Sequence, residues 1–509
     1  MINNNNEATS FLRQKATKRR HVKYLVIAAC LCLVIGGIYG AAKFGLFARI
    51  SGTPGGKEGL IYMSYQGPVF PLTAEDNADN ITADRSITFD FSPYRSGTYV
   101  YEENGVQHSY EHYESETIVT DEYFLTNHSD KDQTLTLFYP FAGSLADRNS
   151  VVPSLSADGE TINTTLHIGP LSDSFSGPND EESRNRNKLD SWESYKSLIE
   201  AGYQTSAFDE LPTLEQPVIV YEIKDRYGEK SDSAPAPMLN MEFYIDYSKT
   251  RIMTYGFNSS TNDMETGYCA RGTSIPEPEN PEYGESAFLI VLGEDIGDYQ
   301  LNAYTSGAFE TKFDNAGATV QRYESTLKEI LTDVSDLYLR NYDSITYGES
   351  DGNLLSGLSK ESFVGLASDL IFRHMLLSES PRDQFSYDMI ENIFSETRNM
   401  GRILYLSFEV TIPERSSISL TAEMAKPASR DFVGKNRSRN GYDMVTTLGS
   451  NLTFGKQRAS ISNTEYVEIV NQNFGFDIAA GVTSVDLDIA QEHYWMDVVK
   501  RMDSEEKHE

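Results

Sequence analysis

Residues 117–139 read Thr117-Ile-Val-Thr-Asp-Glu-Tyr-Phe-Leu125, then Thr126, Asn127-His-Ser-Asp-Lys-Asp132 and Gln133-Thr-Leu-Thr-Leu-Phe-Tyr139. The first and last of these segments alternate apolar with polar residues and are rich in β-branched and aromatic side chains, which predicts two strands. The polar segment between them predicts a turn that joins the two strands into an antiparallel hairpin. Hairpins in series are typical of a β-sandwich.

Strand patterns continue on both sides of this stretch. The Asn104-Gly105 pair, between Glu103 and Val106, favours the tight turn of a second hairpin. Further strands are predicted at Ile87–Phe91, Thr161–Ile168, Pro217–Ile223, Met241–Ile245, Arg251–Phe257, Ala287–Leu292, Ile403–Ile412, Ser416–Glu423, Asp443–Thr447, Tyr466–Val470 and Val482–Ile489. We therefore expect a mainly β ectodomain of two antiparallel sandwiches, one in residues 60–310 and one in residues 401–501.

The pattern becomes helical between these two parts, in residues 311–400. Three helices are predicted there. The second begins at Ser359, and the third begins at Pro381, with Ser380 before it as the helix cap. A short amphipathic helix is also predicted around Trp192–Ile199. The three helices of residues 311–400 are expected to form an insertion packed on a sheet. The first of them is predicted from apolar residues at steps of three and four, as on one face of a helix: Val320, Tyr323, Leu327, Ile330, Val334 and Leu337.

An apolar run near the N-terminus predicts how the chain is attached to a membrane. Tyr24–Ala42 contains 19 residues without a charge or a proline. As a helix this run spans about 28 Å, close to the hydrocarbon thickness of a bilayer. Residues 1–23 are basic, and positive charge stays on the cytoplasmic side. We expect a signal anchor over residues 24–47 with a cytoplasmic N-terminus, a flexible stalk over residues 48–59, an extracellular ectodomain, and a polar tail over residues 502–509.

Two other interpretations compete with an uncleaved anchor. Cys30 follows Ile27-Ala-Ala, as in a lipoprotein cleavage site, but only Tyr24–Ala29 would then form the apolar core. That core is shorter than a signal peptide uses. Cleavage after Ala42 is the stronger alternative, because small residues stand where the protease needs them. The apolar run is longer than the usual core of a signal peptide, so the uncleaved anchor is favoured.

Charge and cysteine content exclude some classes of protein. The whole chain has a formal net charge of −33 and residues 1–49 carry +7, which leaves −40 on residues 50–509. Such a field repels nucleic acid, so we expect no nucleic-acid partner. Cys269 is the one cysteine of the sequence outside the apolar run, which excludes an internal disulfide framework. A large, acidic ectodomain without disulfides fits a bacterial surface.

Three segments resemble parts of known proteins: Gly441–Phe454, Val470–Asp477 and Ile27–Val34. The first two resemble uncharacterised single-pass surface proteins of Gram-positive anaerobic bacteria. The third is similar to the anchors found there, including those of membrane-bound anti-sigma factors. An anti-sigma factor needs a larger cytoplasmic domain than residues 1–23 provide. The resemblance implies a habitat and a topology, and no activity.

One candidate catalytic motif matches the pattern of a zinc protease. His108, Glu111 and His112 form His-x-x-Glu-His, which works on a helix because residues four apart there meet one metal ion. Here the motif follows the Asn104-Gly105 turn and lies among alternating tyrosines, so we expect a strand. Four residues of a strand span about 13 Å, which is too far for one ion. We interpret the match as chance.

A second motif matches the nucleophile elbow of α/β-hydrolases. Ser350 stands in Gly348-Glu-Ser-Asp-Gly352, and His374 or His493 could complete a triad. The elbow needs a buried parallel strand before it. A helix is predicted there instead, so we interpret the motif as a Gly-rich turn between helices.

Acidic turns are weighed as calcium sites. Asp130 with Asp132, or Glu75 with Asp76 and Asp79, could offer carboxylate oxygens to the ion. Neither group completes a calcium-loop pattern, which favours solvated turns.

A basic loop on the acidic ectodomain could hold an anionic ligand such as a wall polymer. An exposed loop between strands is the favoured interpretation. Its residues are Lys426, Arg430, Lys435, Arg437 and Arg439.

These patterns assign no activity, and no catalytic, cofactor-binding or metal site is predicted. We expect a membrane-tethered extracytoplasmic binding or sensing protein without catalytic activity. Its partners would be the lipid bilayer, through residues 24–47, and a cell-wall or protein ligand. One alternative is an anti-sigma-like signalling protein in which residues 1–23 dock a cytoplasmic regulator. The other is a surface hydrolase.

Overall fold

The computed structural model describes residues 64–76, 78–103, 106–146, 151–171, 192–200, 214–275, 286–345, 359–374, 389–431 and 437–501. The predicted cytoplasmic segment, anchor, stalk and polar tail lie outside these ranges. Within them, no helix is long and apolar enough to cross a membrane. Residues 59–430 and 438–509 form one compact unit, to which nearly all of the described residues belong.

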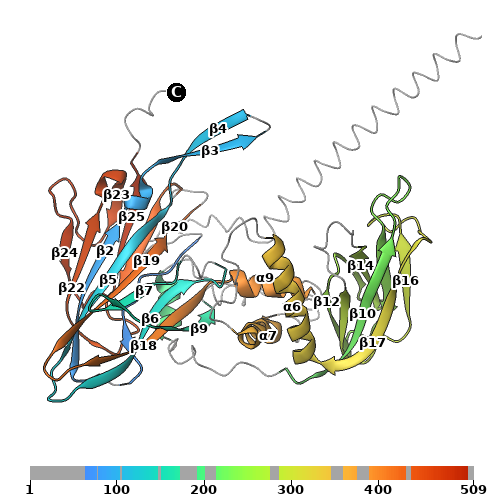
Figure 1. The fold of residues 1–509 in the computed structure, drawn as a ribbon, viewed down its shortest axis with the longest axis horizontal. Coiled ribbons are helices and arrows are strands. Elements are labelled where there is room, and N and C mark those ends of the chain that lie inside the picture. Colours follow the sequence, from blue (N-terminus) through green and yellow to red (C-terminus); the bar gives the residue numbers. More distant parts are fainter. Residues whose placement is uncertain are drawn as a thin grey trace, which may run out of the picture. The chain divides into compact units, whose positions relative to one another are not determined.

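The described residues form mainly β structure with few helices, as predicted (Figure 1). β3 and β4 pair as the hairpin predicted around Asn104-Gly105. The elements before residue 172 are β1 (Thr73–Ala74), β2 (Ile81–Asp90), η1 (Ser92–Tyr94), β3 (Gly97–Glu103), β4 (Val106–His112), β5 (Glu116–Asn127), β6 (Gln133–Gly143), β7 (Ser154–Ala157), β8 (Glu160–Thr161) and β9 (Thr165–Leu171). Those after residue 400 are β18 (Arg402–Ile412), β19 (Ser417–Pro427), β20 (Ser429–Arg430), β21 (Asn440–Val445), β22 (Thr453–Ser462), η3 (Thr464–Tyr466), β23 (Val467–Gln472), β24 (Ser484–Leu487) and β25 (His493–Lys500).

Strands from these two parts of the chain share the same sheets. The seven-stranded sheet has the order β24-β22-β2-β5-β19-β7-β8, and the β6–β18 sheet has the order β1-β6-β18-β9. The β21–β25 sheet has the order β20-β21-β25-β23. The predicted division into one sandwich within residues 60–310 and another within residues 401–501 is therefore wrong. Pairing between strands about 300 residues apart leaves no local pattern, which is why the sequence did not indicate it.

The predicted hairpin of residues 117–139 is also wrong, although both of its strands are present. β5 pairs with β2 and β19 in the seven-stranded sheet, whereas β6 pairs with β1 and β18 in another sheet. Residues 128–132 therefore carry the chain from one sheet to the other. Residues 413–416 make the same crossing between β18 and β19. An alternating pattern indicates a buried face and does not indicate which strand lies alongside.

Side chains hold the two crossings together. Asn127 is buried, and its Nδ2 donates to the carbonyl oxygens of Ile412 at 3.0 Å and Pro413 at 3.1 Å. The same Nδ2 donates to the Lys131 carbonyl oxygen at 2.8 Å, within its own crossing. The backbone N–H of Asn127 donates to the Ser416 carbonyl oxygen at 2.9 Å. This one amide side chain therefore satisfies carbonyl groups of both crossings.

We expect Asn127→Ala to lower the free energy of unfolding by about 1–3 kcal/mol, because buried carbonyl oxygens lose their donor. Chemical denaturation followed by tyrosine fluorescence measures the change. Thr134→Ala is the matched control, because it removes an exposed hydrogen bond to Thr411 that also joins β6 to β18. Its effect should stay within about 0.5 kcal/mol. Equal losses in both variants would show that Asn127 has no special role.

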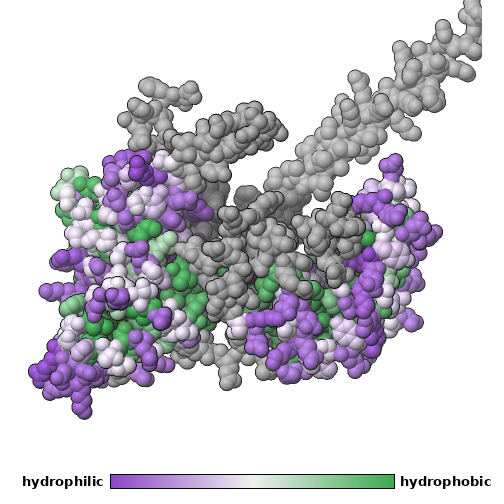
Figure 2. All heavy atoms as spheres, viewed as in Figure 1, coloured by the Kyte–Doolittle hydropathy of each residue, from purple (hydrophilic) through white to green (hydrophobic). Residues whose placement is uncertain are grey.

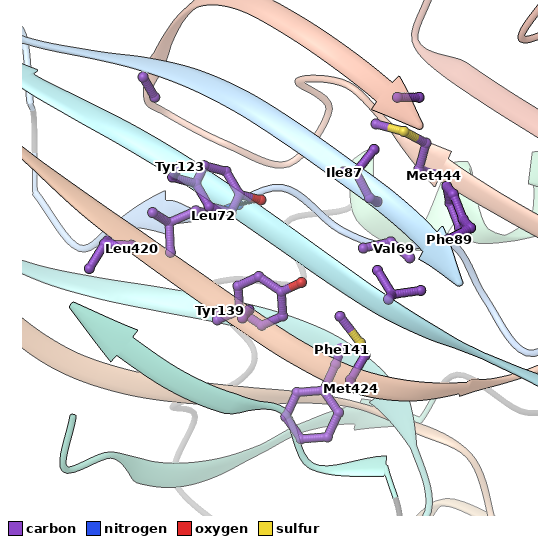
Figure 3. Packing of buried hydrophobic residues seen from close by; sticks show 14 of the residues in the cluster. Val69, Leu72, Ile87, Phe89, Tyr123, Tyr139, Phe141, Leu420, Met424 and Met444 are labelled. Atoms are coloured by element: carbon purple, nitrogen blue, oxygen red, sulfur yellow. Dashed lines mark hydrogen bonds between the residues drawn. The ribbon is translucent and has the colours of Figure 1, made fainter. Parts of the chain in front are cut away.

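One hydrophobic core lies between these sheets. In Figure 3, Ile87, Phe89 and Tyr123 from the seven-stranded sheet meet Tyr139 and Phe141 from the β6–β18 sheet. The β21–β25 sheet adds further residues to the core: Tyr442, Met444, Met496 and Val498. The buried residues of this core come from residues 69–155 and 404–498, so neither part of the chain can bury its apolar faces without the other.

The part of the chain between β9 and β18 has sheets and helices of its own. Its helices are α4 (Trp192–Glu200), α6 (Leu327–Ile345), α7 (Lys360–His374) and α9 (Ile390–Asn399). Its strands are β10 (Pro217–Gly228), β11 (Met238–Tyr244), β12 (Thr250–Tyr255), β13 (Ser259–Asp263), β14 (Tyr268–Ser274), β15 (Ala287–Gly293), β16 (Tyr299–Tyr304) and β17 (Ala316–Thr326). They form the β10–β15 sheet, of order β12-β15-β10-β17, and the β11–β14 sheet, of order β13-β14-β11-β16.

The β10–β15 sheet is covered on both faces. Val220, Met253 and Ile290 point to one face and pack with apolar residues of α6, α7 and α9. Ile223 and Leu289 point to the other face and pack with the β11–β14 sheet. This double burial explains the unbroken apolar run of β15, Ala287–Leu292, which is buried along its length. The β11–β14 sheet is the last layer, so only one of its faces belongs to this core.

The helices agree with the prediction in kind and differ in extent. α7 begins one residue after the predicted Ser359, and the helices pack on a sheet as expected. The first helix begins at Leu327, so Val320 and Tyr323 were wrongly assigned to it: they lie in β17, which pairs along its length with β10. Pairing with a neighbouring strand overrides a spacing of three residues that also suits a helix. The predicted start of the third helix at Pro381 lies outside the described residues.

Candidate binding face

The outer face of the β11–β14 sheet carries polar and aromatic side chains. Strand alternation turns Leu239, Met241 and Phe243 into the core, so the residues between them point away from it. Antiparallel pairing aligns Tyr244 with Tyr268 and brings the other members alongside. We define the outer face as Asn240, Glu242 and Tyr244 of β11, Tyr268 of β14, and Gln300, Asn302 and Tyr304 of β16.

Glu242 is the centre of a hydrogen-bond network on this face. Its Oε1 accepts from Asn302 Nδ2 at 3.1 Å, from the Tyr304 hydroxyl at 3.2 Å and from Asn240 Nδ2 at 3.3 Å. Lys312 Nζ donates to the Asn302 Oδ1 at 3.0 Å, which fixes that amide from its other end. The carboxylate is thus held by neutral donors from two strands, and its position is set before any ligand arrives.

Aromatic rings flank the carboxylate. Tyr244 and Tyr268 contact each other edge to face, with ring centroids 5.5 Å apart, and Tyr304 contacts Phe309 in the same way at 5.4 Å. Tyr244 is 62% exposed, so most of its ring is open to solvent. An exposed ring held by a neighbouring ring offers an apolar surface of fixed orientation.

A glycine allows Phe309 to pack on this face. A Cβ atom at Gly272 would lie 2.5 Å from Cζ of Phe309 and 2.2 Å from the Ser259 hydroxyl, so a side chain here would displace the ring. Phe309 itself has a φ of 53°, a left-handed conformation that bulky residues rarely adopt. Gly272 pairs with Asn240 on β11, so the ring lies next to the buried end of the network.

The hydroxyl groups of Tyr268 and Tyr304 are donors on this face. Burial raises the pKa of each, and the negative charge of Glu242 and a hydrogen bond to it raise the pKa further. Both groups therefore keep their protons at neutral pH. Chemically, the face combines a carboxylate acceptor, amides, hydroxyl donors and apolar rings, which is a set that binds polar ligands with apolar surfaces.

The motif around His108 lies in β4, so the predicted strand is confirmed. Across the ranges that the structure describes, no group of three or more His, Cys, Asp or Glu side chains is arranged to hold a metal ion.

Ser350 lies outside the described residues, and His493 has a different environment from the one a triad needs. His493 Nε2 is 2.9 Å from an Asp443 carboxylate oxygen, and its ring stacks on Trp192 with centroids 4.4 Å apart. The Tyr65 hydroxyl donates to the same carboxylate oxygen. These contacts connect α4 and the segment around Tyr65 to β21 and β25, so the cluster has a structural role.

The acidic turns also have structural roles. Asp130 forms an ion pair with Arg415, and an Asp132 oxygen accepts from the Glu414 backbone N–H at 2.9 Å. Both contacts join the two crossings between sheets. The Glu75 backbone N–H donates to the Thr136 carbonyl oxygen at 2.9 Å, which extends the pairing of β1 with β6.

The predicted basic loop is wrong for Lys426. This residue belongs to β19, is only 5% exposed, and donates from Nζ to the Gln66 carbonyl oxygen at 2.7 Å. It continues the inward phase of that strand, after Ile418, Leu420, Ala422 and Met424. Arg430 and Arg437 are exposed, and Arg439 lies 3.7 Å from an Asp497 oxygen. Lys435 lies outside the described residues.

No protein-family model and no curated protein matches this chain. A proposal for its function therefore rests on the sequence and on the geometry of the outer face.

Proposed function

We propose that the protein is a membrane-tethered extracytoplasmic binding protein of a bacterial surface, without catalytic activity. Residues 24–47 would anchor it in the bilayer with the N-terminus in the cytoplasm, and the β-rich part would form a sandwich-type ectodomain. The apolar run, the basic residues before it and the acidic chain after it support this topology.

The outer face of the β11–β14 sheet is the observation that carries the binding role. A sheet face on the outside of a fold needs only polar side chains to stay in water. This one instead exposes Tyr244 and fixes Glu242, Asn302 and Tyr304 in a single network. Exposed aromatic residues beside preorganised polar groups are enriched at sites of recognition.

Protease shaving of intact cells tests the topology. We expect external protease to digest the chain beyond residue 60 while a membrane-bound N-terminal fragment survives. Protection of residues 60–509 in intact cells, with digestion after lysis, would contradict the extracytoplasmic location.

Retention on isolated envelope tests the binding role. The full chain, held in lipid nanodiscs, should sediment with purified cell wall of the source bacterium and should saturate as its concentration rises. Empty nanodiscs are the control. If the chain stays in the supernatant at every concentration, the proposed binding function is wrong.

A further inference from the structure

We infer that the outer face binds a neutral carbohydrate, such as a glycan strand of the cell wall, by stacking on Tyr244 and hydrogen bonding around Glu242. The inference rests on the proposed function, because it names the ligand class of the same site. A pyranose ring has two faces of C–H groups and a rim of hydroxyl groups that both donate and accept hydrogen bonds. The outer face has a counterpart for each of these parts.

Tyr244 is the counterpart of the C–H face. Its ring is 62% exposed, and the edge-to-face contact with Tyr268 restrains it at an interplanar angle of 63°. A tyrosine offers a large, rigid and amphipathic surface at a low cost in conformational entropy. A sugar ring stacked there would remove apolar surface of both partners from water while its hydroxyl groups reach the neighbouring strand.

The network around Glu242 is the counterpart of the hydroxyl rim. A carboxylate offers about four acceptor sites, and the three amide and phenol donors described above all converge on Oε1. Gln300, which pairs with Glu242 on β16, is exposed and can both donate and accept. Hydroxyl groups fit such a mixed set better than ions do, because each hydroxyl can match an acceptor or a donor.

Asn240 supplies a second, independent indication of a ligand. It is 5% exposed, and its Oδ1 has no hydrogen-bond donor among the described residues. A buried oxygen without a donor costs free energy, which a ligand hydroxyl can recover. Phe309 packs over Gly272, the β14 partner of Asn240, so this ring lies at the same end of the outer face as the oxygen.

Charge and ring geometry favour a neutral sugar over two charged ligands. An anionic wall polymer would meet the Glu242 carboxylate and the net charge of −40 on residues 50–509. A quaternary ammonium group needs several ring faces turned toward one point. Here the ring pairs Tyr244–Tyr268 and Tyr304–Phe309 are both edge to face, so the faces within each pair do not converge.

Calorimetric titration of the nanodisc-held full chain tests the inference. The probes are tetrasaccharides of N-acetylglucosamine, glucose, mannose and galactose, with choline and polyglycerol phosphate as charged probes. We expect saturable binding of at least one tetrasaccharide, with a Kd between about 10 μM and 1 mM. Tyr244→Ala and Glu242→Gln should each raise that Kd about tenfold or more.

Tyr227→Ala is the matched control, because Tyr227 is also a strand tyrosine and is also 62% exposed but lies on β10, outside the outer face. Its Kd should match that of the unchanged chain, and thermal melts should confirm that all variants fold. Failure of all four tetrasaccharides to bind saturably would overturn the inference, whether or not a charged probe binds. If the chain still sediments with cell wall in that case, the proposed function stands; if it binds neither wall nor sugar, both fail.

Discussion

Asp121→Asn should lower the free energy of unfolding by about 3–5 kcal/mol, because it leaves the guanidinium group of Arg85 charged and unpaired inside the core. Arg85 Nε and Nη2 each donate to a different carboxylate oxygen of Asp121 at 2.8 Å, and neither side chain is exposed. Burial lowers the pKa of Arg85, but the Asp121 charge outweighs burial and the pKa ends above its ordinary value. Without Asp121 only burial acts on this pKa, yet a guanidinium group keeps its proton in proteins, so Arg85 stays charged in the variant.

The carboxylate of Asp121 also holds two buried phenols. The hydroxyl groups of Tyr123 and Tyr139 donate to Oδ2 at 2.8 and 3.0 Å, from β5 and β6 respectively. Arg85 in turn donates to the carbonyl oxygens of Val445 and Phe70, at 2.6 and 3.2 Å. One buried charge pair thus bonds to three sheets and to the segment around Phe70, which precedes β1. We therefore expect its loss to destabilise the whole core.

Urea denaturation measures this first prediction against two controls. The double variant Arg85→Met/Asp121→Leu removes both charges and should recover part of the loss, since the remaining cost comes from the tyrosine hydroxyl groups. Asp486→Asn breaks an exposed pair with Arg458 in the seven-stranded sheet and should leave stability unchanged within error. An Asp121→Asn effect as small as that of Asp486→Asn would contradict the account of the core.

Lys426 should make the protein more stable as pH rises from about 8 to 10. Burial lowers the pKa of Lys426 to about 8, although the nearby Asp443 carboxylate acts in the opposite direction. In the unfolded chain the group has its ordinary pKa of about 10.4, so between these values the unfolded state binds the extra proton. Stability rises with pH wherever the unfolded state binds more protons. The gain over this window is about 3 kcal/mol at most.

The buried tyrosines set the upper end of this window. Burial raises the pKa of Tyr65, Tyr123 and Tyr442, so above pH 10 the unfolded state loses phenol protons that the folded state keeps. Stability should therefore fall again beyond that pH. Denaturation curves at intervals between pH 7 and 11 measure the profile. Lys426→Met should abolish the rise and keep the fall, whereas a rise that survives in this variant would exclude Lys426 as its cause.

Local features of the fold followed from the sequence, and long-range ones did not. The alternation of residues 117–125 correctly predicted a strand, and the structure shows that the buried phase of this strand contains Val119, Asp121 and Tyr123. It could not indicate that the next strand joins a different sheet, because a chain reversal and a crossing between sheets both use a polar turn. Asn127 stabilises the crossing through a hydrogen bond to Ile412, a partner so distant in the sequence that no local pattern contains it.

The candidate site was missed for a related reason. Met241–Ile245 was predicted as a strand, and its alternation does separate Met241 and Phe243 from Glu242 and Tyr244. What turns those polar positions into a site is their register with Tyr268 and with the amides of β16, and register is a property of three strands together. The signal that could have found the site is a solvent-facing strand phase that contains a tyrosine beside a carboxylate.

Retention on purified cell wall, compared between Tyr244→Ala and Tyr227→Ala, tests the central claim most directly. The two tyrosines have the same exposed fraction, and only Tyr244 belongs to the outer face. The account predicts that the nanodisc-held full chain loses wall retention with Tyr244→Ala and keeps it with Tyr227→Ala. Equal retention of the two variants would contradict the claim that the outer face of the β11–β14 sheet is the binding site.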